Sequence, residues 1–464
     1  MGSVAVENSA TTEISSATAT SMLPPQHLQN DIQQRTAAEI QLQDVQTVSN
    51  LEKIMEQVRE VRRKLVTEVL SEGGGAQGRW EASLSNALCS LQREMAVGGR
   101  RRELLAGQGH RISLDLADEV GGIQKDILFL RHSCMSTAEA ADAFLSALSV
   151  HQPDPASFLE EVQKLCSFLR SLFQRHEDEQ LELFLTDWDG TMKNYCCNYA
   201  TSQQPAYSAV ILVRFALAHA WRHAAVLTAG PLADPGILNL TCVPTDDSVL
   251  FGGSWGREWL LRKGEERVVE EATATEEARA AFQQLARLLQ AQLLNQPHSP
   301  HYLFRFVGSG FQRKVDRITL GIQNVSQDVS GPQQDAYLLA VMALLSTVDP
   351  KGSLFLVRRE PMDVEIVLRA NQEVVWNKAK GLELLLKHLN TSLQDRVCLI
   401  CGDTTSDLPM VEFARSLSPH TYAVFVNPSQ AVKERLQQIY GPNEEHKYCL
   451  VSCPEVLHAA MAKA

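Results

Sequence analysis

The chain has 464 residues, of which 44% are apolar and 21% charged, as is typical of a globular protein with roughly two to four domains. Its formal net charge of −12 argues against nucleic acid as the main partner, because proteins that bind nucleic acid usually present a basic face. Its apolar runs are too short and interrupted for a membrane span, and its first residues match neither a signal peptide nor a transit peptide. We therefore expect a cytoplasmic protein with no membrane span and no nucleic-acid partner.

The N-terminal part of the chain has two segments that differ in composition and periodicity. Residues 1–30 are rich in Ser, Thr and Ala and poor in large apolar side chains, so we expect them to be disordered. Residues 31–177 have a helical pattern, and between Val48 and Val69 an apolar residue recurs every three or four positions, with Arg62 as the interruption. Similar periodicity continues over 79–96, 115–149 and 156–176. We predict a helical bundle without catalytic groups; a dimerising coiled coil is the alternative, so a protein partner or self-association through these helices stays open.

The remainder of the chain has the alternation of an α/β protein with a parallel sheet. Apolar strand-like runs are found in LELFLTD, HAAVLTAG, RVCLICGD, YAVFVN and KYCLVS. We predict a catalytic core built from residues 178–255 and 369–464. The intervening 256–368 reads as a second α/β module inserted into the first, with helices at 275–295 and 334–347. Its strands are expected in YLFRFVGSGFQRKVDRITLGIQ, SLFLVRR and MDVEIVLRA.

Two aspartates follow the first of the apolar runs. Asp187 and Asp189, with Gly190 and Thr191, stand where LELFLT ends. Because sites in open parallel sheets form at the carboxyl ends of the strands, Asp187 is expected at a strand tip. A carboxylate there could attack phosphorus, and the second could protonate the leaving oxygen and then activate water. An acidic turn with an aspartate cap would leave the same pattern.

Two later segments carry groups that suit a phosphoryl oxygen. Thr228 ends the run AVLT, and the hydroxyl together with free backbone N–H groups at Ala229 and Gly230 could bind phosphate. In VVWNKAKG, Lys378 or Lys380 could neutralise the phosphoryl group. Taken singly, a turn after a strand and a surface lysine would look the same.

A further apolar run also ends at an acid. In LICGDTTSDLPM, Asp403 follows the strand and Asp407 stands four residues later. Carboxylates converging on one sheet edge need a hard cation, and Mg²⁺ takes oxygen ligands. A helix cap at Asp403 is the alternative.

The ten cysteines of the chain show no framework of a disulfide-rich domain, which favours a reducing compartment. Cys398 and Cys401 have the CxxC spacing of a zinc site, and Cys449 and Cys453 follow later. Strand residues three apart face opposite sides of a sheet, so we predict buried thiols instead.

In their order along the chain, DWDGT, the Thr strand end, the Lys and GDTTSD resemble the haloacid dehalogenase superfamily of phosphatases. The stretches TDWDGTMK, LTAGP, GSWGREW, VGSGFQRKVDR and WNK are similar to the roundworm-type trehalose-6-phosphate phosphatases, which carry a helical N-terminal extension. The resemblance implies an α/β, Rossmann-like haloacid dehalogenase core with an inserted C2-type α/β cap. An N-terminal helical domain, MIT-like in architecture, would precede the core.

The resemblance also implies roles for the motif residues. Asp187 would be the nucleophile, and Asp189 the acid and base whose backbone carbonyl also touches the metal. Thr228 and Lys378 would hold the phosphoryl group, with Lys380 as the competitor because the NKAKG spacing departs from the family pattern. The residues that would bind Mg²⁺ are Asp187, Asp189, Asp403 and Asp407.

Substrate specificity would come from the insert, because a phosphatase core does not distinguish one phosphate ester from another. The candidate substrate-binding residues are Arg313, Lys314, Arg317, Glu365, Trp255 and Arg257. A solvated strand edge is the alternative for the basic residues, a hinge salt bridge for Glu365, and a core position for Trp255.

The function implied is Mg²⁺-dependent hydrolysis of a small-molecule substrate, trehalose 6-phosphate, through an aspartyl-phosphate intermediate. Two alternatives remain open: a phosphatase of another sugar phosphate, such as sucrose phosphate or a hexose phosphate, and a scaffold protein whose core is a relic.

Overall fold

The computed structural model describes residues 39–464 except 72–76, 94, 96–98, 108, 110, 133–137, 180, 220, 247, 262–265, 272–273 and 370–375. The segment 1–30, predicted to be disordered, lies outside the described residues. Within the described ranges, no helix combines the length and the apolar character that crossing a bilayer requires.

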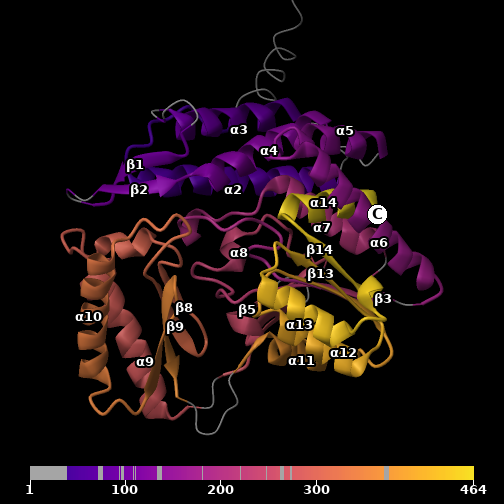
Figure 1. Ribbon diagram of the computed structural model, residues 1–464. Coiled ribbons are helices and arrows are strands. Elements are labelled where there is room, and N and C mark those ends of the chain that lie inside the picture. The colour runs from indigo at the N-terminus through magenta and orange to yellow at the C-terminus, as the bar shows by residue number, and fades with distance from the viewer. Residues whose placement is uncertain are drawn as a thin grey trace, which may run out of the picture. The chain divides into compact units, whose positions relative to one another are not determined.

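An eight-stranded sheet forms the centre of the C-terminal half (Figure 1). Its order is β14-β13-β12-β3-β4-β5-β6-β7; β14 to β5 pair in parallel, and β6 and β7 are antiparallel. The strands are β3 (Leu181–Thr186), β4 (His223–Leu227), β5 (Leu250–Gly253), β6 (Glu258–Leu261), β7 (Glu266–Val269), β12 (Val397–Gly402), β13 (Thr421–Val426) and β14 (Tyr448–Val451). The five predicted runs all form strands here. The sheet also continues through β6 and β7, beyond residue 255, where the insert was predicted to begin.

Alternating side chains give this sheet two apolar faces. Phe184 and Val424 belong to one core, and their chain neighbours Leu185 and Phe425 belong to a second core on the opposite face. The first core includes α7 (Ala206–Ala218) and α14 (Pro454–Lys463); the second includes α11 (Lys378–His388), α12 (Leu408–Leu417) and α13 (Gln430–Tyr440). The sheet is therefore buried on both sides, as a parallel sheet requires.

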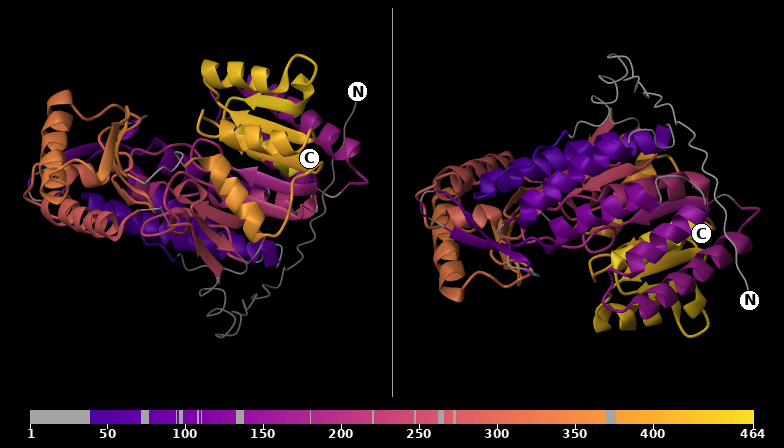
Figure 2. Two further views of the ribbon diagram at one scale, coloured as in Figure 1. Left: turned by 90° about the horizontal axis from the view of Figure 1, so that it is seen from below. Right: turned by 90° about the horizontal axis from the view of Figure 1, so that it is seen from above.

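Helices α2 to α6 precede the sheet and confirm the predicted helical bundle. They are α2 (Val48–Ser71), α3 (Gln77–Gln92), α4 (Ala117–His132), α5 (Ala138–Ser149) and α6 (Pro155–Arg175). A hairpin of β1 (Arg101–Leu105) and β2 (Arg111–Asp115), which the sequence did not predict, lies between α3 and α4. These helices share one continuous apolar core with α7 and α14, and Figure 2 shows them over the same face of the sheet.

The apolar stripe predicted on α2 is buried inside this core. Val48, Leu51 and Val58 are each almost inaccessible to solvent, and so is Arg62, which interrupts the stripe. Arg62 Nε pairs with Asp126 Oδ2 of α4 at 2.7 Å, so the buried positive charge of Arg62 is balanced by a carboxylate of the same chain. Because this stripe is buried within the chain, it is not available as the seam of the dimerising coiled coil that was the alternative.

The inserted segment forms a smaller layer of two helices on a sheet. The four-stranded antiparallel sheet has the order β10 (Phe355–Arg359), β11 (Asp363–Leu368), β9 (Arg317–Gly321), β8 (Phe311–Arg313). Helices α9 (Glu276–Leu289) and α10 (Gly331–Val348) pack on one face, against side chains such as Ile318 and Ile366. The predicted helices and most strands are present, but YLFRF forms a 3-10 turn, Tyr302–Phe306. The opposite face of the sheet carries the alternate residues, among them Arg317 and Glu365.

The prediction of buried thiols is confirmed for three of the four cysteines concerned. Cys398, Cys401 and Cys449 are buried and free, whereas Cys453 is partly buried at the start of α14. Cys398 and Cys401 lie in different cores, on opposite faces of the sheet, as expected for strand residues three apart.

Candidate active site

Three of the predicted residues meet at one edge of the large sheet because their strands are neighbours. Asp187 follows β3, Thr228 follows β4, and Asp403 follows β12, and the sheet order is β12-β3-β4. The register brings the strand ends level, and Asp187 N donates to the carbonyl oxygen of Cys401 at 2.9 Å. The carboxyl ends of parallel strands thus collect groups that are far apart in the chain.

Two helix starts complete this cluster. Lys378 is the first residue of α11, after the N-cap Asn377, and Asp407 immediately precedes α12. The buried ammonium group of Lys378 donates to Oδ1 of Asp187 and, at 2.5 Å, to Oδ1 of Asp407. Lys380 lies elsewhere, with its nitrogen 5.8 Å from the centroid of the Trp376 ring. The fold therefore brings Lys378 to the acidic groups and leaves Lys380 outside them.

The acidic cluster consists of Asp187, Asp403 and Asp407, each of which offers a carboxylate oxygen within 4.8 Å of the others. Burial raises the pKa of Asp187 to about 7 although Lys378 opposes the shift. Burial, followed by the charges of Asp187 and Asp407, raises the pKa of Asp403 to about 9. Burial acts to raise the pKa of Asp407, but the charge and hydrogen bond of Lys378, together with the backbone N–H groups of Thr404 and Asp403, hold that pKa below its ordinary value. A single ammonium group thus faces three carboxylates.

This donor set fits a divalent cation such as Mg²⁺. Carboxylate oxygens are the ligands that Mg²⁺ prefers, and its charge would offset the excess negative charge. Oδ1 of Asp403 is buried and has no hydrogen-bond partner within the described residues. Asp407 is less free, because its Oδ2 accepts from the backbone nitrogens of Asp403 and Thr404 at 3.1 and 3.0 Å. Asp187 accepts from Lys378 at Oδ1 and from Thr191 Oγ1 at Oδ2, so Asp403 is the least engaged of the three carboxylates.

Asp189 does not belong to this cluster, although it borders the same cavity. Its Oδ1 accepts from Nζ of Lys193 at 2.5 Å, and Lys193 also donates to Oγ of Ser202. Lys193 is only 4% exposed, so this contact is shielded from water. The carboxylate of Asp189 is thus held to the side of the acidic cluster.

Gly190 and Tyr195 both approach Asp403 closely. Gly190 has φ +84°, and a Cβ atom there would lie 2.0 Å from Oδ2 of Asp403, so both conformation and space require glycine. The hydroxyl of Tyr195 donates to the same Oδ2 at 2.9 Å. The irregular segment after β3 therefore shapes one wall of the acidic cluster.

Thr228 and the residues after it form the next wall. Thr228 is buried; its backbone nitrogen donates to Gly252 O at 3.0 Å, and its Oγ1 accepts from Gly230 N at 3.1 Å. Ala229 and Gly230 border the cavity beside it, and a Cβ at Gly230 would lie 2.7 Å from the hydroxyl oxygen of Tyr199. The loop is therefore closely packed beside the acidic cluster.

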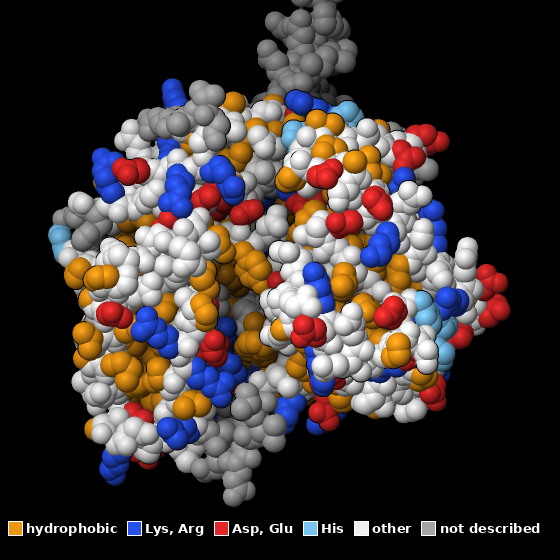
Figure 3. Space-filling view, viewed as in Figure 1, with side chains coloured by type: hydrophobic (Ala, Val, Ile, Leu, Met, Phe, Trp, Pro, Cys, Tyr) orange, Lys and Arg blue, Asp and Glu red, His pale blue; other side chains and the backbone are white. Residues whose placement is uncertain are grey.

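A cavity of about 920 Å³ separates the sheet edge from the inserted segment. Figure 3 shows a hollow between the part of the molecule that carries β8 and β9 and the part that carries α11 to α13, with apolar side chains at its back. The residues that the insert contributes to the wall include Gln312, Lys314, Arg317, Thr319, Asp363 and Glu365. The volume is in the range of small-molecule sites.

Four of the six candidate substrate residues line this cavity. Glu365 is central, with Oε2 3.0 Å from Nη1 of Arg317 and Oε1 4.0 Å from Nζ of Lys314. Trp255 lines the cavity beside them, with the guanidinium carbon of Arg317 5.6 Å from its ring centroid. Burial lowers the pKa of Lys314, and Glu365 opposes that shift. Cationic and anionic groups thus alternate on one wall.

Arg313 and Arg257 lie outside this cavity. Strand alternation turns exposed Arg313 to the opposite side, where it borders a second cavity of about 500 Å³ and its guanidinium carbon lies 5.9 Å from the Phe282 ring centroid. Arg257 is buried, pairs with Asp316 at 3.3 Å and covers the ring of Trp376 at 4.2 Å. Arg257 therefore braces the junction between the insert and the core.

Each of the two halves of the chain matches a known protein family. Residues 184–457 match the family Trehalose-6-phosphate phosphatase, C-terminal, and residues 47–148 match the Trehalose-6-phosphate phosphatase N-terminal helical bundle domain. This chain belongs to the trehalose-6-phosphate phosphatase family. The resemblance inferred from its motifs is thereby confirmed.

Similar members of the trehalose-6-phosphate phosphatase family come from roundworms. The chain is 37% identical to a protein named trehalose-phosphatase from Brugia malayi, over 90% of this chain and 86% of that protein. It is 36% identical to one of the same name from Caenorhabditis briggsae, covering 90% and 97% of the two chains. A third, from Caenorhabditis elegans, is 35% identical over 90% of this chain and 95% of its own. The likeness therefore extends over the helical bundle as well as the sheet.

The segment that follows Asp189 contributes to the site but was not predicted from the sequence. Lys193 and Tyr195 contact the acidic groups directly, and Ser202 supports Lys193. The spacing of Lys193, four residues after Asp189, was the only available signal. Nothing in the sequence indicates that Tyr195 folds back onto Asp403.

Proposed function

We propose that this chain hydrolyses trehalose 6-phosphate to trehalose and phosphate. The observation that carries the proposal is the acidic cluster around Lys378, which faces the Lys314, Arg317 and Glu365 wall across one cavity. One side has groups suited to phosphoryl transfer, and the other has charged groups suited to sugar hydroxyls. The roundworm relatives named trehalose-phosphatase support the choice of substrate.

In the proposed first step, a carboxylate oxygen of Asp187 attacks phosphorus. A bond forms between that oxygen and phosphorus, and the bond from phosphorus to the sugar oxygen breaks. Asp189 donates a proton to the departing oxygen, so trehalose leaves as a neutral alcohol. Lys378 and Thr228 hold the phosphoryl oxygens while their charge is redistributed.

In the proposed second step, water attacks the phosphorus of the aspartyl phosphate. Asp189, now ionised, accepts the proton from that water, and the bond between Asp187 and phosphorus breaks to release phosphate. Because Lys193 holds the carboxylate of Asp189 in this structure, both proton transfers require that carboxylate to turn toward the cavity. Lys193 is then the group that sets its resting position.

We propose that Mg²⁺ is held by Asp187 and Asp403, with Asp407 behind them and the backbone carbonyl of Asp189 as a further ligand. The fit rests on the carboxylate cluster and on the buried Oδ1 of Asp403, which has no partner among the described residues. When bound, the ion would neutralise charge on the phosphoryl oxygens.

We propose that Glu365 accepts hydroxyl groups of the disaccharide and that Lys314 and Arg317 donate to its oxygens. These three side chains already contact one another, so their orientation is set before the sugar binds. Trp255 offers an apolar surface beside them. Hydrogen bonds to charged groups discriminate well, because a sugar that cannot make them leaves buried charges without partners.

A substrate panel tests the proposal. The purified full chain, with Mg²⁺, is assayed for phosphate release from trehalose 6-phosphate, sucrose 6-phosphate and glucose 6-phosphate. We expect kcat/KM to be highest for trehalose 6-phosphate by roughly tenfold or more. A higher value for either other ester would replace the proposed substrate while keeping the chemistry, and no release from any of them would favour the scaffold.

We also propose a cytoplasmic location and an assembly through the N-terminal helices. The cysteines within the described residues are all free thiols, which is typical of a reducing compartment.

Since the apolar stripe of α2 is buried, self-association through the N-terminal helices would have to use another face of these helices. Cell fractionation and light scattering of the purified chain test these two points separately.

A further inference from the structure

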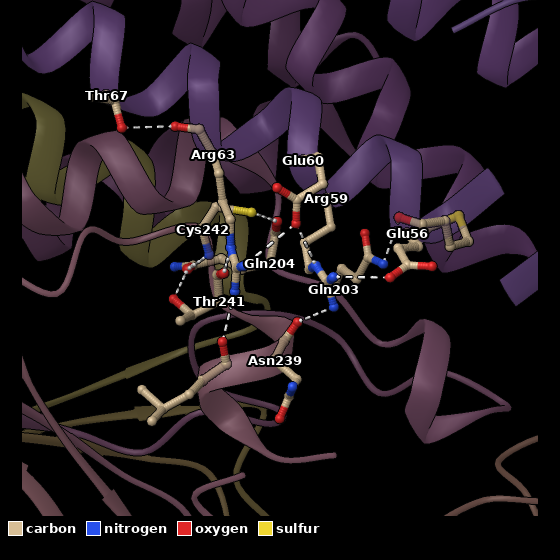
Figure 4. Close-up of polar contacts among 12 residues, drawn as sticks. Glu56, Arg59, Glu60, Arg63, Thr67, Gln203, Gln204, Asn239, Thr241 and Cys242 are labelled. Atoms are coloured by element: carbon tan, nitrogen blue, oxygen red, sulfur yellow. Dashed lines mark hydrogen bonds and ion pairs between the residues drawn. The ribbon is translucent and has the colours of Figure 1, made fainter. Parts of the chain in front are cut away.

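Helix α2 of the N-terminal bundle holds the end of a short helix in the catalytic half. Arg63 donates from Nη2 to Leu238 O at 2.6 Å and from Nε to Thr241 O at 3.2 Å. Arg59 Nη1 donates to Asn239 O at 3.0 Å, and Figure 4 shows both arginines reaching down from α2 to these carbonyls. The helix α8 (Ile237–Leu240) has only four residues, so its last carbonyls depend on partners from outside.

Two glutamates on α2 orient these arginines. Glu60 lies 3.3 Å from Arg59 and 3.5 Å from Arg63, and Glu56 lies 3.4 Å from Arg59. Figure 4 shows Glu56 and Glu60 on either side of the guanidinium group of Arg59. Since the side chains of Arg59 and Arg63 are only 19% and 37% exposed, the contact is partly shielded from water. The arginines are therefore built into the contact with α8.

The held helix α8 is tied by backbone hydrogen bonds to the loop that carries Thr228. Ile237 N donates to Pro231 O and Leu238 N to Leu232 O, both at 3.0 Å. Gly230, which contacts Thr228 Oγ1, also accepts from Ser254 N at 2.6 Å. A displacement of α8 would therefore be passed through residues 230–232 to the wall of the acidic cluster.

Helix α2 also contacts a second wall of the site, the segment that contains Ser202 and Gln203. Gln203 Nε2 donates to Met55 O of α2 at 2.7 Å, and Gln203 follows Ser202, the partner of Lys193. The two walls are joined next to this point, because Thr241 Oγ1 donates to Gln204 Oε1 at 2.9 Å (Figure 4). Helix α2 thus contacts both segments that frame the phosphoryl side of the cavity.

We propose that Arg59 and Arg63 are positioning residues for phosphoryl transfer, which hold α8 and thereby keep Thr228 and Gly230 in place opposite Asp187. The inference rests on the proposed phosphatase chemistry but not on the identity of the sugar. It makes the N-terminal helical bundle a part of the catalytic unit. A misplacement of about 1 Å in such a site costs roughly 100-fold in rate, so small movements of α8 matter.

The test compares full-length variants on two esters, trehalose 6-phosphate and the sugar-free p-nitrophenyl phosphate. Arg63→Met keeps the aliphatic stem but removes both hydrogen bonds to the carbonyl groups of Leu238 and Thr241, and Arg63→Lys retains one cationic donor. Lys64→Met is the matched control, because Lys64 is the next residue of α2, is 55% exposed and pairs only with Glu39 among the described residues. Circular dichroism and melting temperature establish that each variant is folded.

We expect Arg63→Met to lower kcat by roughly 10- to 100-fold on both esters by the same factor, with KM changed less than about threefold. Arg63→Lys should recover part of kcat, and Lys64→Met should match the parent chain. A folded Arg63→Met with the kcat of the control on p-nitrophenyl phosphate would overturn the inference. Should Arg63→Met not fold, Arg59→Gln decides the matter, because it removes only one hydrogen bond to α8, the one to Asn239 O: a few-fold loss of kcat supports the inference, and an unchanged kcat contradicts it.

These readouts separate the two proposals. If the parent chain cleaves p-nitrophenyl phosphate but not trehalose 6-phosphate, the proposed substrate fails, and the variants still test the role of α2. If both esters are cleaved and Arg63→Met impairs only the sugar ester, the arginines act on sugar binding and the inference fails.

Discussion

Lys378 and Asp187 are 191 residues apart in the chain, yet the ammonium group of Lys378 donates a hydrogen bond directly to Oδ1 of Asp187. Both side chains are buried, and Asp407 accepts from the same ammonium group. Lys378 is the cation that pairs with this cluster among the described residues, and three carboxylates left together without it would be costly in a buried site.

This contact predicts that substituting Lys378 and substituting Lys380 with methionine have different effects on kcat. Lys378→Met should lower kcat by roughly 1,000-fold, because the phosphoryl oxygens lose a cationic partner. Lys380→Met, the matched control two residues away, should stay within a few-fold of the parent chain. Steady-state kinetics on trehalose 6-phosphate measure both; equal losses, or a larger loss for Lys380→Met, would contradict the assignment.

Much of the fold could be predicted because strong local patterns specify it. The apolar runs that end at Thr186 and Gly402 form adjacent strands, and parallel pairing then brings Asp187 and Asp403 together. The choice between the lysines could not be predicted, because it depends on where α11 starts. That start is set by Asn377, whose side chain accepts from Lys380 N.

Other features depend on contacts that no local pattern records. Arg313 and Lys314 are neighbours in the chain, but Arg313 borders the second cavity alone whereas Lys314 borders both cavities, because β8 ends at Arg313 and the chain turns toward β9 at Lys314. Tyr195 reaches Asp403 across an irregular segment, and Arg63 reaches Leu238 over 175 positions of sequence. Such contacts are fixed by tertiary packing and not by periodicity.

Removal of divalent cations should abolish phosphate release, and added Mg²⁺ should restore it. A readout independent of activity is the melting temperature, which should rise with Mg²⁺ because a ligand that binds only the folded state stabilises it. Asp403→Asn should weaken that rise, whereas Asp335→Asn, on the exposed surface of the insert, should not. Full activity in excess chelator would rule out the proposed metal.

Glu365→Gln should impair binding of the sugar more than the chemical step. The substitution removes the charge that Arg317 and Lys314 contact, so KM for trehalose 6-phosphate should rise roughly tenfold or more. Turnover of p-nitrophenyl phosphate should change little. Arg313→Met is the control, since Arg313 faces the second cavity; a similar rise in KM for that variant would argue against the assignment of the sugar site.

The buried carboxyl group of Glu119 should make the free energy of unfolding depend on pH. Burial raises the pKa of this α4 carboxyl to about 7; the Thr201 hydroxyl and the Lys193 charge oppose the shift, and Asp118 adds to it. Because the pKa in the folded state lies above the ordinary value of 4.5, the protonated acid favours folding. The stability that this group contributes is present below pH about 4.5 and is lost as pH rises toward 7, by about 3 kcal/mol in all.

Glu119→Gln tests this dependence, because glutamine imitates the neutral acid. Relative to the parent chain, its free energy of unfolding should increase between pH 5 and pH 7.5 in denaturant titrations. Glu139→Gln, on the exposed face of α5, provides a control with the same change in charge. A difference between Glu119→Gln and the parent chain that does not vary with pH would show that the carboxyl titrates normally.

The central claim is that Asp187 carries the phosphoryl group during turnover. The direct measurement is acid quenching of the enzyme within milliseconds of mixing with trehalose 6-phosphate and Mg²⁺, followed by digestion and mass spectrometry. We predict one phosphoryl group on the peptide that contains Asp187, and none in Asp187→Asn, whose kcat should fall by roughly 10,000-fold or more. Rapid turnover with no phosphorylated peptide, or full activity of Asp187→Asn, would contradict the account.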